Sequence, residues 1–252
     1  MKNVIVIAKN TFREAIRDRI LYALIGFALL FIALDLFLAK LALGDIVMIK
    51  SFGLAGIYIF GLIITIFLGA SIIYKEIERR TLYFILSKPV SGFEVIMGKF
   101  LGLFGAIILT TALMTAIYLA VIFYESGTLD YLGLVAVFFQ ILEMGLFTAI
   151  LIFFSSVAAP MTSTLCAIMI LFSGHLLGSV MQNAQTIGGG ILKFVQVIYY
   201  LLPNLEKFNL RDLAAHSIST TPSAAILTIG YAVIYSSILI YLANVFLKRR
   251  EL

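Results

Sequence analysis

Three ionisable side chains stand inside long apolar runs of the sequence: Asp35, Glu143 and His175. Such groups are rare within membrane-spanning helices, where they mark polar paths, proton relays or paired charges. An imidazole beside a carboxylate can exchange a proton with it or form an ion pair. We expect the three side chains to lie in the outer half of a helix bundle. There they either line a substrate path or have a structural role, in which Glu143 pairs with His175 or Gln140 or is simply protonated.

Residues for other kinds of chemistry are scarce. The chain has two histidines and a single cysteine, Cys166, so it lacks the ligands of a usual zinc site and the partner for a disulfide. The nucleotide-binding pattern GxxxxGK[ST] and the hydrolase patterns HExxH and GxSxG do not occur in it. We therefore predict no catalytic residue, no metal site and no cofactor in this chain.

The composition is that of a membrane protein. Of the 252 residues, 62% are hydrophobic and 12% are charged, whereas a soluble domain carries about 25% charged residues. The apolar runs are long and continuous rather than alternating, which favours helices over a barrel. The sequence therefore predicts an all-α polytopic protein with one transmembrane domain, residues 1–252. Its six spans are expected at 20–39, 52–73, 101–124, 131–154, 165–181 and 223–247.

Two further segments flank these spans. Residues 1–19 alternate polar and apolar positions at helical spacing, which predicts an amphipathic helix at the membrane surface with a basic polar face. Residues 182–222 form an outer connection, in which the apolar stretch 191–202 is too short to span a membrane. We expect one or two helices there that lie at the outer interface or re-enter it. The pairs Gly98/Gly102 and Gly174/Gly178 have the GxxxG spacing that permits close helix packing.

The distribution of positive charge predicts the orientation. With a cytoplasmic N-terminus, thirteen of the 18 Lys and Arg residues fall on the cytoplasmic side. Cytoplasmic loops of membrane proteins carry an excess of Lys and Arg. Both termini and the segment 74–100 are therefore predicted to be cytoplasmic.

The segment 74–100 is charged and interrupted by a proline. Glu76 and Arg80 stand four residues apart and would pair on one face of a helix, and the helix must stop before Pro89. Ser91 and Glu94 have the spacing of a capping box, which predicts a new helix from Gly92. The segment is either a solvated loop whose charges set the topology or a docking surface for another protein.

The pattern of this segment resembles that of a known family. Its sequence is similar to the permease subunits of type-2 ABC exporters, in particular the branch associated with multicopper-enzyme maturation. The resemblance extends over the whole chain, with six spans, an amphipathic first helix and a basic C-terminus. It departs at Gly92, where many members have Arg. The matching positions are Glu76, Glu78, Arg80, Thr81, Lys88, Pro89, Val90, Ser91, Glu94, Gly98 and Lys99.

The resemblance implies that residues 74–100 contain a coupling helix that docks on a separate ATP-binding subunit. Arg79 and the matching positions are expected to bind that partner. ATP and magnesium would bind that partner. Two permease chains, identical or paralogous, would assemble with two ATPases in the cell membrane, surrounded by lipid and without nucleic acid. Two alternatives remain open: an ion-driven secondary transporter or channel that uses Asp35, Glu143 and His175, and a membrane anchor that transports nothing. The resemblance does not identify the cargo.

Overall fold

A computed structural model describes residues 2–41, 45–70, 90–218 and 221–250 of the chain. Those residues form helices and connections, and no strand occurs among them. This confirms the predicted all-α class. The helices are α1 (Lys2–Arg17), α2 (Arg19–Leu41), α3 (Ile46–Gly69), α6 (Gly92–Ser126), α7 (Tyr131–Val157), α8 (Pro160–Ile187), α9 (Gly189–Leu201), the short 3-10 helix η1 (Glu206–Phe208), α10 (Arg211–Ala215) and α11 (Pro222–Arg250).

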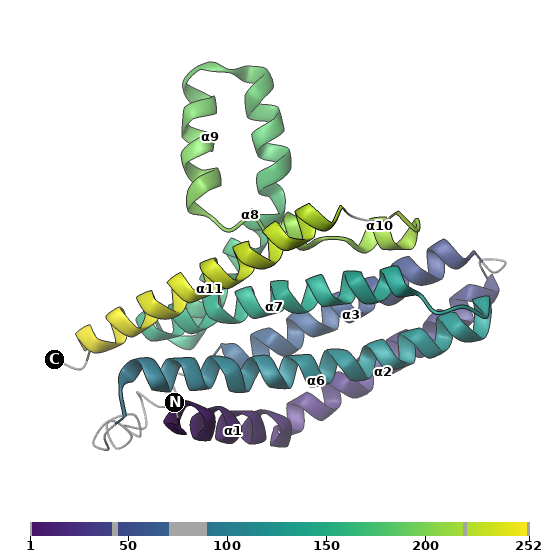
Figure 1. Cartoon of the computed structure of the whole chain (residues 1–252), viewed down its shortest axis with the longest axis horizontal. Helices are drawn as coiled ribbons and strands as arrows, with labels where there is room; N and C mark the ends of the chain where they lie inside the picture. Colours follow the sequence, from purple (N-terminus) through teal and green to yellow (C-terminus); the bar gives the residue numbers. More distant parts are fainter. Residues whose placement is uncertain (1, 42–44, 71–89, 219–220, 251–252) are drawn as a thin grey trace.

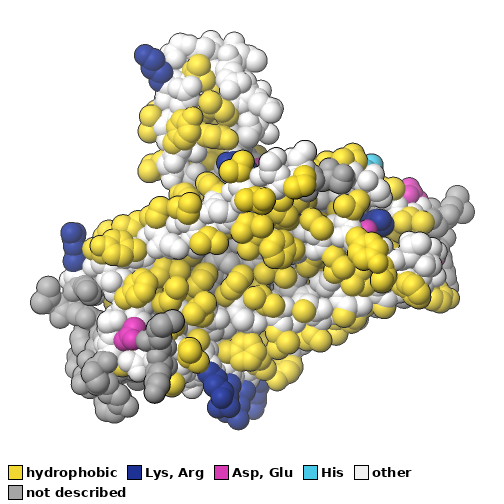
Figure 2. Space-filling model, viewed as in Figure 1, with side chains coloured by type: hydrophobic (Ala, Val, Ile, Leu, Met, Phe, Trp, Pro, Cys, Tyr) yellow, Lys and Arg dark blue, Asp and Glu magenta, His cyan; other side chains and the backbone are white. Residues whose placement is uncertain are grey.

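Five helices in the described residues are long and apolar enough to cross a membrane: α3, α6, α7, α8 and the stretch Pro222–Leu247 of α11. The remaining predicted span, residues 20–39, falls in α2, which is a helix of 23 residues. Apolar side chains also cover much of the outside of the bundle, as Figure 2 shows, and this suits a surface that faces lipid. The chain is therefore a multi-pass helical membrane protein.

The helices α2, α3, α6, α7 and α11 run roughly along the longest axis of the molecule, while the second part of α8 turns away from it (Figure 1). α7 lies at the centre, in contact with α3, α6, α8 and α11. Its middle section is buried on every side, from Met144 to Ile152. The hairpin formed by the end of α8 and by α9 stands away from this bundle (Figure 1), and no residue of α9 is buried. The core of the protein is thus built around α7.

α8 is longer than the predicted span 165–181. It begins at Pro160, because a proline at the first helical position needs no hydrogen-bond donor and already has a helical φ. It ends at Gly188, whose φ of 70° suits glycine and lets the chain reverse into α9. The predicted link before residue 165 and the start of the predicted outer connection are therefore helical.

α6 begins as the sequence predicts. The side chain of Ser91 accepts a hydrogen bond from the Glu94 backbone, and the Glu94 side chain accepts one from the Ser91 backbone, which completes the capping box. No break interrupts the helix before Ser126, so its 35 residues form one rod about 52 Å long. The part of the predicted segment 74–100 that follows Ser91 is the first part of this rod.

The end of the bundle at which α6 turns into α7 is held by a buried ion pair. Lys50 at the start of α3 donates to Asp130 at a distance of 3.0 Å, and Asp130 precedes α7. The hydroxyl of Tyr118 on α6 donates to the other oxygen of the same carboxylate at 2.6 Å. One carboxylate therefore joins three helices where α6 turns into α7.

α1 packs along the first part of α6, and the two helices run in the same direction, since Asn3 contacts Glu94 while Phe12 contacts Gly105. The contact is close because Gly98 and Gly102 have no side chains. A Cβ atom at Gly102 would lie 2.6 Å from the carbonyl oxygen of Ala8. The apolar face of the predicted surface helix is therefore largely covered by α6, and the Gly98/Gly102 pair serves the close packing predicted for it.

Replacing Gly102 with Ala should destabilise the protein by about 1–3 kcal/mol, because the new methyl group meets backbone atoms of α1 that cannot rotate away. The melting temperature of the detergent-purified protein measures this loss. Gly26→Ala on α2 is the matched control, since nothing lies within 4 Å of the added atom. Equal melting temperatures for the two variants would contradict the packing argument.

Candidate functional site

Glu143 and His175 meet inside the bundle. Glu143 lies in the buried middle of α7, and His175 lies on α8. The Nε2 atom of His175 is 2.8 Å from Oε1 of Glu143, whose side chain is 1% exposed. Two of the three ionisable groups singled out in the sequence therefore form one contact. Asp35 belongs to α2, but its side chain lies outside the described residues.

Tyr58 of α3 completes the inner part of the site. Its hydroxyl donates to Oε1 of Glu143 at 2.6 Å and lies 2.7 Å from Nε2 of His175. The carboxylate oxygen, the phenol and the imidazole thus form a triangle contributed by three helices. A carboxylate buried away from water needs such donors, because an unpaired charge there is very costly.

The outer part of the site comes from the connection between α9 and α11. The Nδ1 atom of His175 is 3.0 Å from Oε2 of Glu206 in η1, and Glu206 is half exposed. Asn209 donates from Nδ2 to Oε1 of Glu206 at 3.0 Å, and Arg211 donates from Nε to the Asn209 side chain at 2.9 Å. His175 therefore joins the buried carboxylate of Glu143 to the connection.

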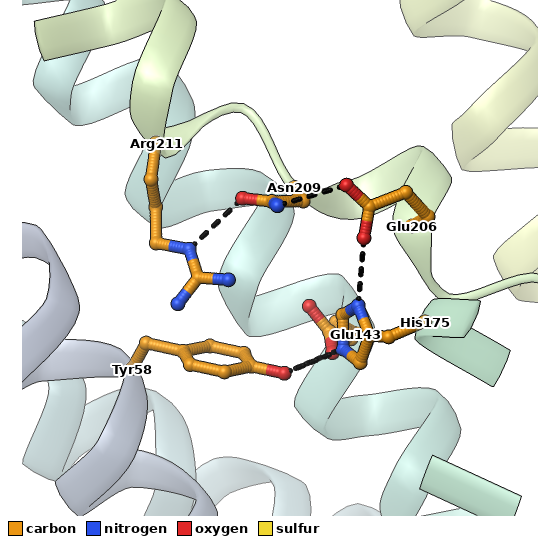
Figure 3. A network of polar contacts seen from close by, with 6 residues as sticks. All are labelled: Tyr58, Glu143, His175, Glu206, Asn209 and Arg211. Atoms are coloured by element: carbon orange, nitrogen blue, oxygen red, sulfur yellow. Dashed lines mark hydrogen bonds and ion pairs between the residues drawn. The ribbon is translucent and has the colours of Figure 1, made fainter. Parts of the chain in front are cut away.

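Arg211 closes the arrangement into a ring. Its guanidinium group lies over the aromatic ring of Tyr58, 3.9 Å from the centroid. Such a contact attracts the cation to the electron-rich face of the ring, most strongly where water is excluded. Figure 3 shows all six side chains converging between α3, α7, α8 and the outer connection. We call these residues the polar ring: Tyr58, Glu143, His175, Glu206, Asn209 and Arg211.

A glycine on α8 allows the outer connection to reach this position. A Cβ atom at Gly174 would lie 2.6 Å from the carbonyl oxygen of Pro203, so only glycine admits the turn that precedes η1. The Leu205 amide donates to the Gly174 carbonyl, and the side chains of Leu205 and Phe208 are fully buried. The Gly174/Gly178 pair therefore does not pack a helix, because Gly174 receives a turn while Gly178 has open space.

The geometry restricts where the proton of His175 can be. Each ring nitrogen faces a carboxylate oxygen, and an ionised carboxylate only accepts hydrogen bonds. If both carboxylates are ionised, both nitrogens donate and the ring is an imidazolium. If the ring is neutral, one nitrogen donates and the other accepts, and the Tyr58 hydroxyl lies 2.7 Å from Nε2. The direction of each hydrogen bond of His175 therefore depends on which of its nitrogens carry a proton.

The contacts of the polar ring join separate elements of the chain. No group of three or more His, Cys, Asp or Glu side chains in the described part of the chain is placed to hold a metal ion. His175 uses each of its nitrogens on a different carboxylate, so it separates the two acids instead of converging with them on a common point. The ring joins α3, α7 and α8 to the connection between α9 and α11.

The residues predicted for partner binding divide into three groups. Those that fall in residues 71–89 lie outside the described residues, and they are Glu76, Glu78, Arg79, Arg80, Thr81, Lys88 and Pro89. Val90, Ser91 and Glu94 lie at the start of α6. Gly98 lies beneath α1, and Lys99 is buried with 3% exposure. That these two residues contact the partner stays a prediction.

Four members of the polar ring were not singled out in the sequence. Tyr58 is uncharged, and nothing in its span separates it from the other tyrosines of the chain. Glu206, Asn209 and Arg211 carry a weak signal, since they are polar residues within an otherwise apolar connection. Their relation to His175 depends on the turn at Gly174, which spacing along the chain does not reveal.

Glu143 and His175 should behave as a coupled pair in a double-mutant cycle. Glu143→Ala and His175→Ala should each lower the stability of the protein. We expect the sum of these two stability losses to exceed the loss in the double variant by about 0.5–3 kcal/mol, since either change alone leaves a buried polar group without its partner. Melting of the purified protein measures the three losses. Glu143→Ala combined with Lys50→Ala, a change at the separate outer ion pair, is the control and should be additive. Additive losses for Glu143 and His175 would contradict the coupling.

Comparison with known proteins assigns the family. A comparison with curated proteins finds no match. The family model described as "ABC-2 family transporter protein" matches residues 5–252, which is nearly the whole chain. The match includes the long helices, the polar ring and the segment between α3 and α6. The chain therefore belongs to the ABC-2 transporter family and is a membrane permease subunit of an ABC transporter.

Proposed function

We propose that this permease is part of an exporter driven by a separate ATP-binding subunit that docks on residues 74–94. The observation that carries the proposal is the form of α6. The helix starts at a complete capping box directly after that segment and continues unbroken for 35 residues to the opposite end of the bundle. A force applied at its start is therefore transmitted along the whole rod.

Packing at both ends supports this role for α6. Near its start the helix is held against α1 through Gly98 and Gly102, so the two helices move together. Near its other end Tyr118 holds the Asp130 carboxylate that also pairs with Lys50. Closure of two ATPases would then tilt α6 with α1 and shift the outer corner. In this proposal two permease chains and two ATPases form the transporter, and both termini are cytoplasmic.

The polar ring would act as the outer latch of the cycle. It fastens the connection between α9 and α11 to α3, α7 and α8 through the contact between Glu206 and His175. A conformation that opens the outer side must release this contact, and ATP binding can favour that conformation only by interacting differently with the two states. Within the family, the multicopper-maturation branch remains a prediction from the sequence, and the transported cargo stays open.

A second candidate function is suggested by the contact between Glu143 and His175. A buried carboxylate in contact with an imidazole can form a proton relay, as in pumps and transporters. This function would need neither the partner nor the segment 74–94. The two candidates therefore differ in what each requires.

Exchanging the charges of Glu78 and Arg80 should abolish recovery of the ATP-binding subunit. In Glu78→Arg/Arg80→Glu the total charge is kept, but each exchanged side chain faces a partner group of the same sign. The tagged protein is purified from native membranes in mild detergent, and co-purifying chains are identified by mass spectrometry. The partner is recognised by its GxxxxGK[ST] sequence. Glu125→Lys/Lys193→Glu exchanges two exposed charges at other sites and should leave recovery unchanged. Undiminished recovery in the first variant would show that the docking site lies elsewhere.

Glu143→Gln separates the two functions. In liposomes that contain the wild-type permease without its partner, an imposed pH gradient should produce no proton flux, as followed with a pH-sensitive dye. In liposomes with the partner, the variant should still assemble but should alter ATP hydrolysis, because the latch is changed. Proton flux through the permease alone that disappears in Glu143→Gln would instead support the ion-driven transporter.

A further inference from the structure

We propose that Lys9, Arg13, Arg17 and Arg19 bind the phosphate groups of anionic phospholipids in the adjacent leaflet. We call these four residues the basic stripe. All four side chains are exposed. Within the described residues, none of them donates a hydrogen bond or pairs with a carboxylate in the structure. This inference goes beyond the proposed function and does not require the ATP-binding partner.

α1 places three of the four stripe residues on one face, and Arg19 is the first residue of α2. Lys9, Arg13 and Arg17 stand at four-residue steps, so their side chains lie above one another along α1. The opposite face of α1 is occupied by α6, which receives Ala8 and Thr11 beside Gly102. The packing that holds α1 in place therefore forces the basic side chains outward.

The surroundings of the stripe are apolar, which points to lipid. Ile5 on α1 is 66% exposed one turn before Lys9. Directly after Arg19, the side chains of Tyr22, Phe27 and Leu30 are also largely exposed on α2. Figure 2 shows the corresponding group of basic side chains at the lower edge of the molecule, where α1 lies in the same view, next to hydrophobic side chains. Cations that border a lipid-facing apolar surface stand at the depth of the phosphate groups.

The chemistry of the stripe also favours phosphate. Three of the four residues are arginines, whose planar guanidinium groups form paired hydrogen bonds with phosphate oxygens. Glu14 and Asp18 are the acidic residues nearby. Because four basic residues stand against these two acidic ones, the stripe keeps an excess of positive charge. A soluble protein partner would have to cover the exposed aromatic side chains of α2 as well, whereas a bilayer covers both surfaces at once.

The test measures stabilisation of the whole chain by lipid. The protein is purified in an uncharged detergent and titrated with mixed micelles that contain either phosphatidylglycerol or phosphatidylcholine, while its melting temperature is followed. A third titration uses inorganic phosphate. We expect phosphatidylglycerol to act at a much lower concentration than phosphatidylcholine, and this preference to weaken at high salt. Stabilisation by inorganic phosphate alone, or equal action of the two lipids, would overturn the proposal.

Removing two charges should weaken the effect strongly. Each basic residue at an anionic surface strengthens binding by about fivefold, so Arg13→Gln/Arg17→Gln should require about 30-fold more phosphatidylglycerol for the same stabilisation. Lys193→Gln/Arg249→Gln removes two exposed cations outside the stripe and should leave the phosphatidylglycerol response unchanged. An equal loss in both double variants would show that only total charge matters, and the proposal would fail.

A conservative variant guards against a change in membrane insertion. Arg13→Lys/Arg17→Lys keeps the positive charges that orient the chain but loses the paired hydrogen bonds. It should respond between the wild type and the Gln variant. If both variants keep the full lipid preference while recovery of the ATP-binding subunit falls, the stripe contacts the partner and the lipid proposal is wrong.

Discussion

The contact of His175 with two carboxylates is the interaction on which the packing between α3, α7, α8 and the connection between α9 and α11 depends. Removing a carboxylate such as Glu143 from water costs several kcal/mol unless donors replace the lost hydration. The hydroxyl of Tyr58 and the imidazole supply them at 2.6 Å and 2.8 Å. Meeting that need brings α3, α7 and α8 to fixed positions around one oxygen atom. The second carboxylate, Glu206, then fastens the outer connection to the same ring.

Small residues decide which elements can approach the bundle. Gly102 admits the backbone of α1 at one end, and Gly174 admits the turn before η1 on α8. In both places a carbonyl oxygen occupies the space of the missing side chain, so the contact is between backbones and cannot be relieved by a rotamer change. Each close approach also has a consequence for charge. The first turns the basic side chains of α1 outward, and the second brings Glu206 to His175.

These two constraints act on different helices, and α6 and α7 connect them, since a Cβ atom at Gly145 on α7 would meet the Phe104 ring on α6. α6 carries the contact with α1 and ends beside the Lys50–Asp130 pair, while α7 begins at Asp130 and carries Glu143. Both helices are continuous, and the centre of α7 is buried on all sides. In the proposed cycle these helices would move as rigid rods, and the polar ring would be the contact that is released.

The sequence by itself determined the helical membrane class, the approximate position of each apolar helix and the start of α6, because these depend on residues close together along the chain. Burial of long apolar runs and the Ser91–Glu94 capping box are local properties. Only the tertiary structure decided that Glu143 meets His175, that Tyr58 and Arg211 join them, and that Gly98 is covered by α1. Those contacts join residues tens of positions apart, and their geometry follows from how whole helices pack, which no local pattern of residues encodes.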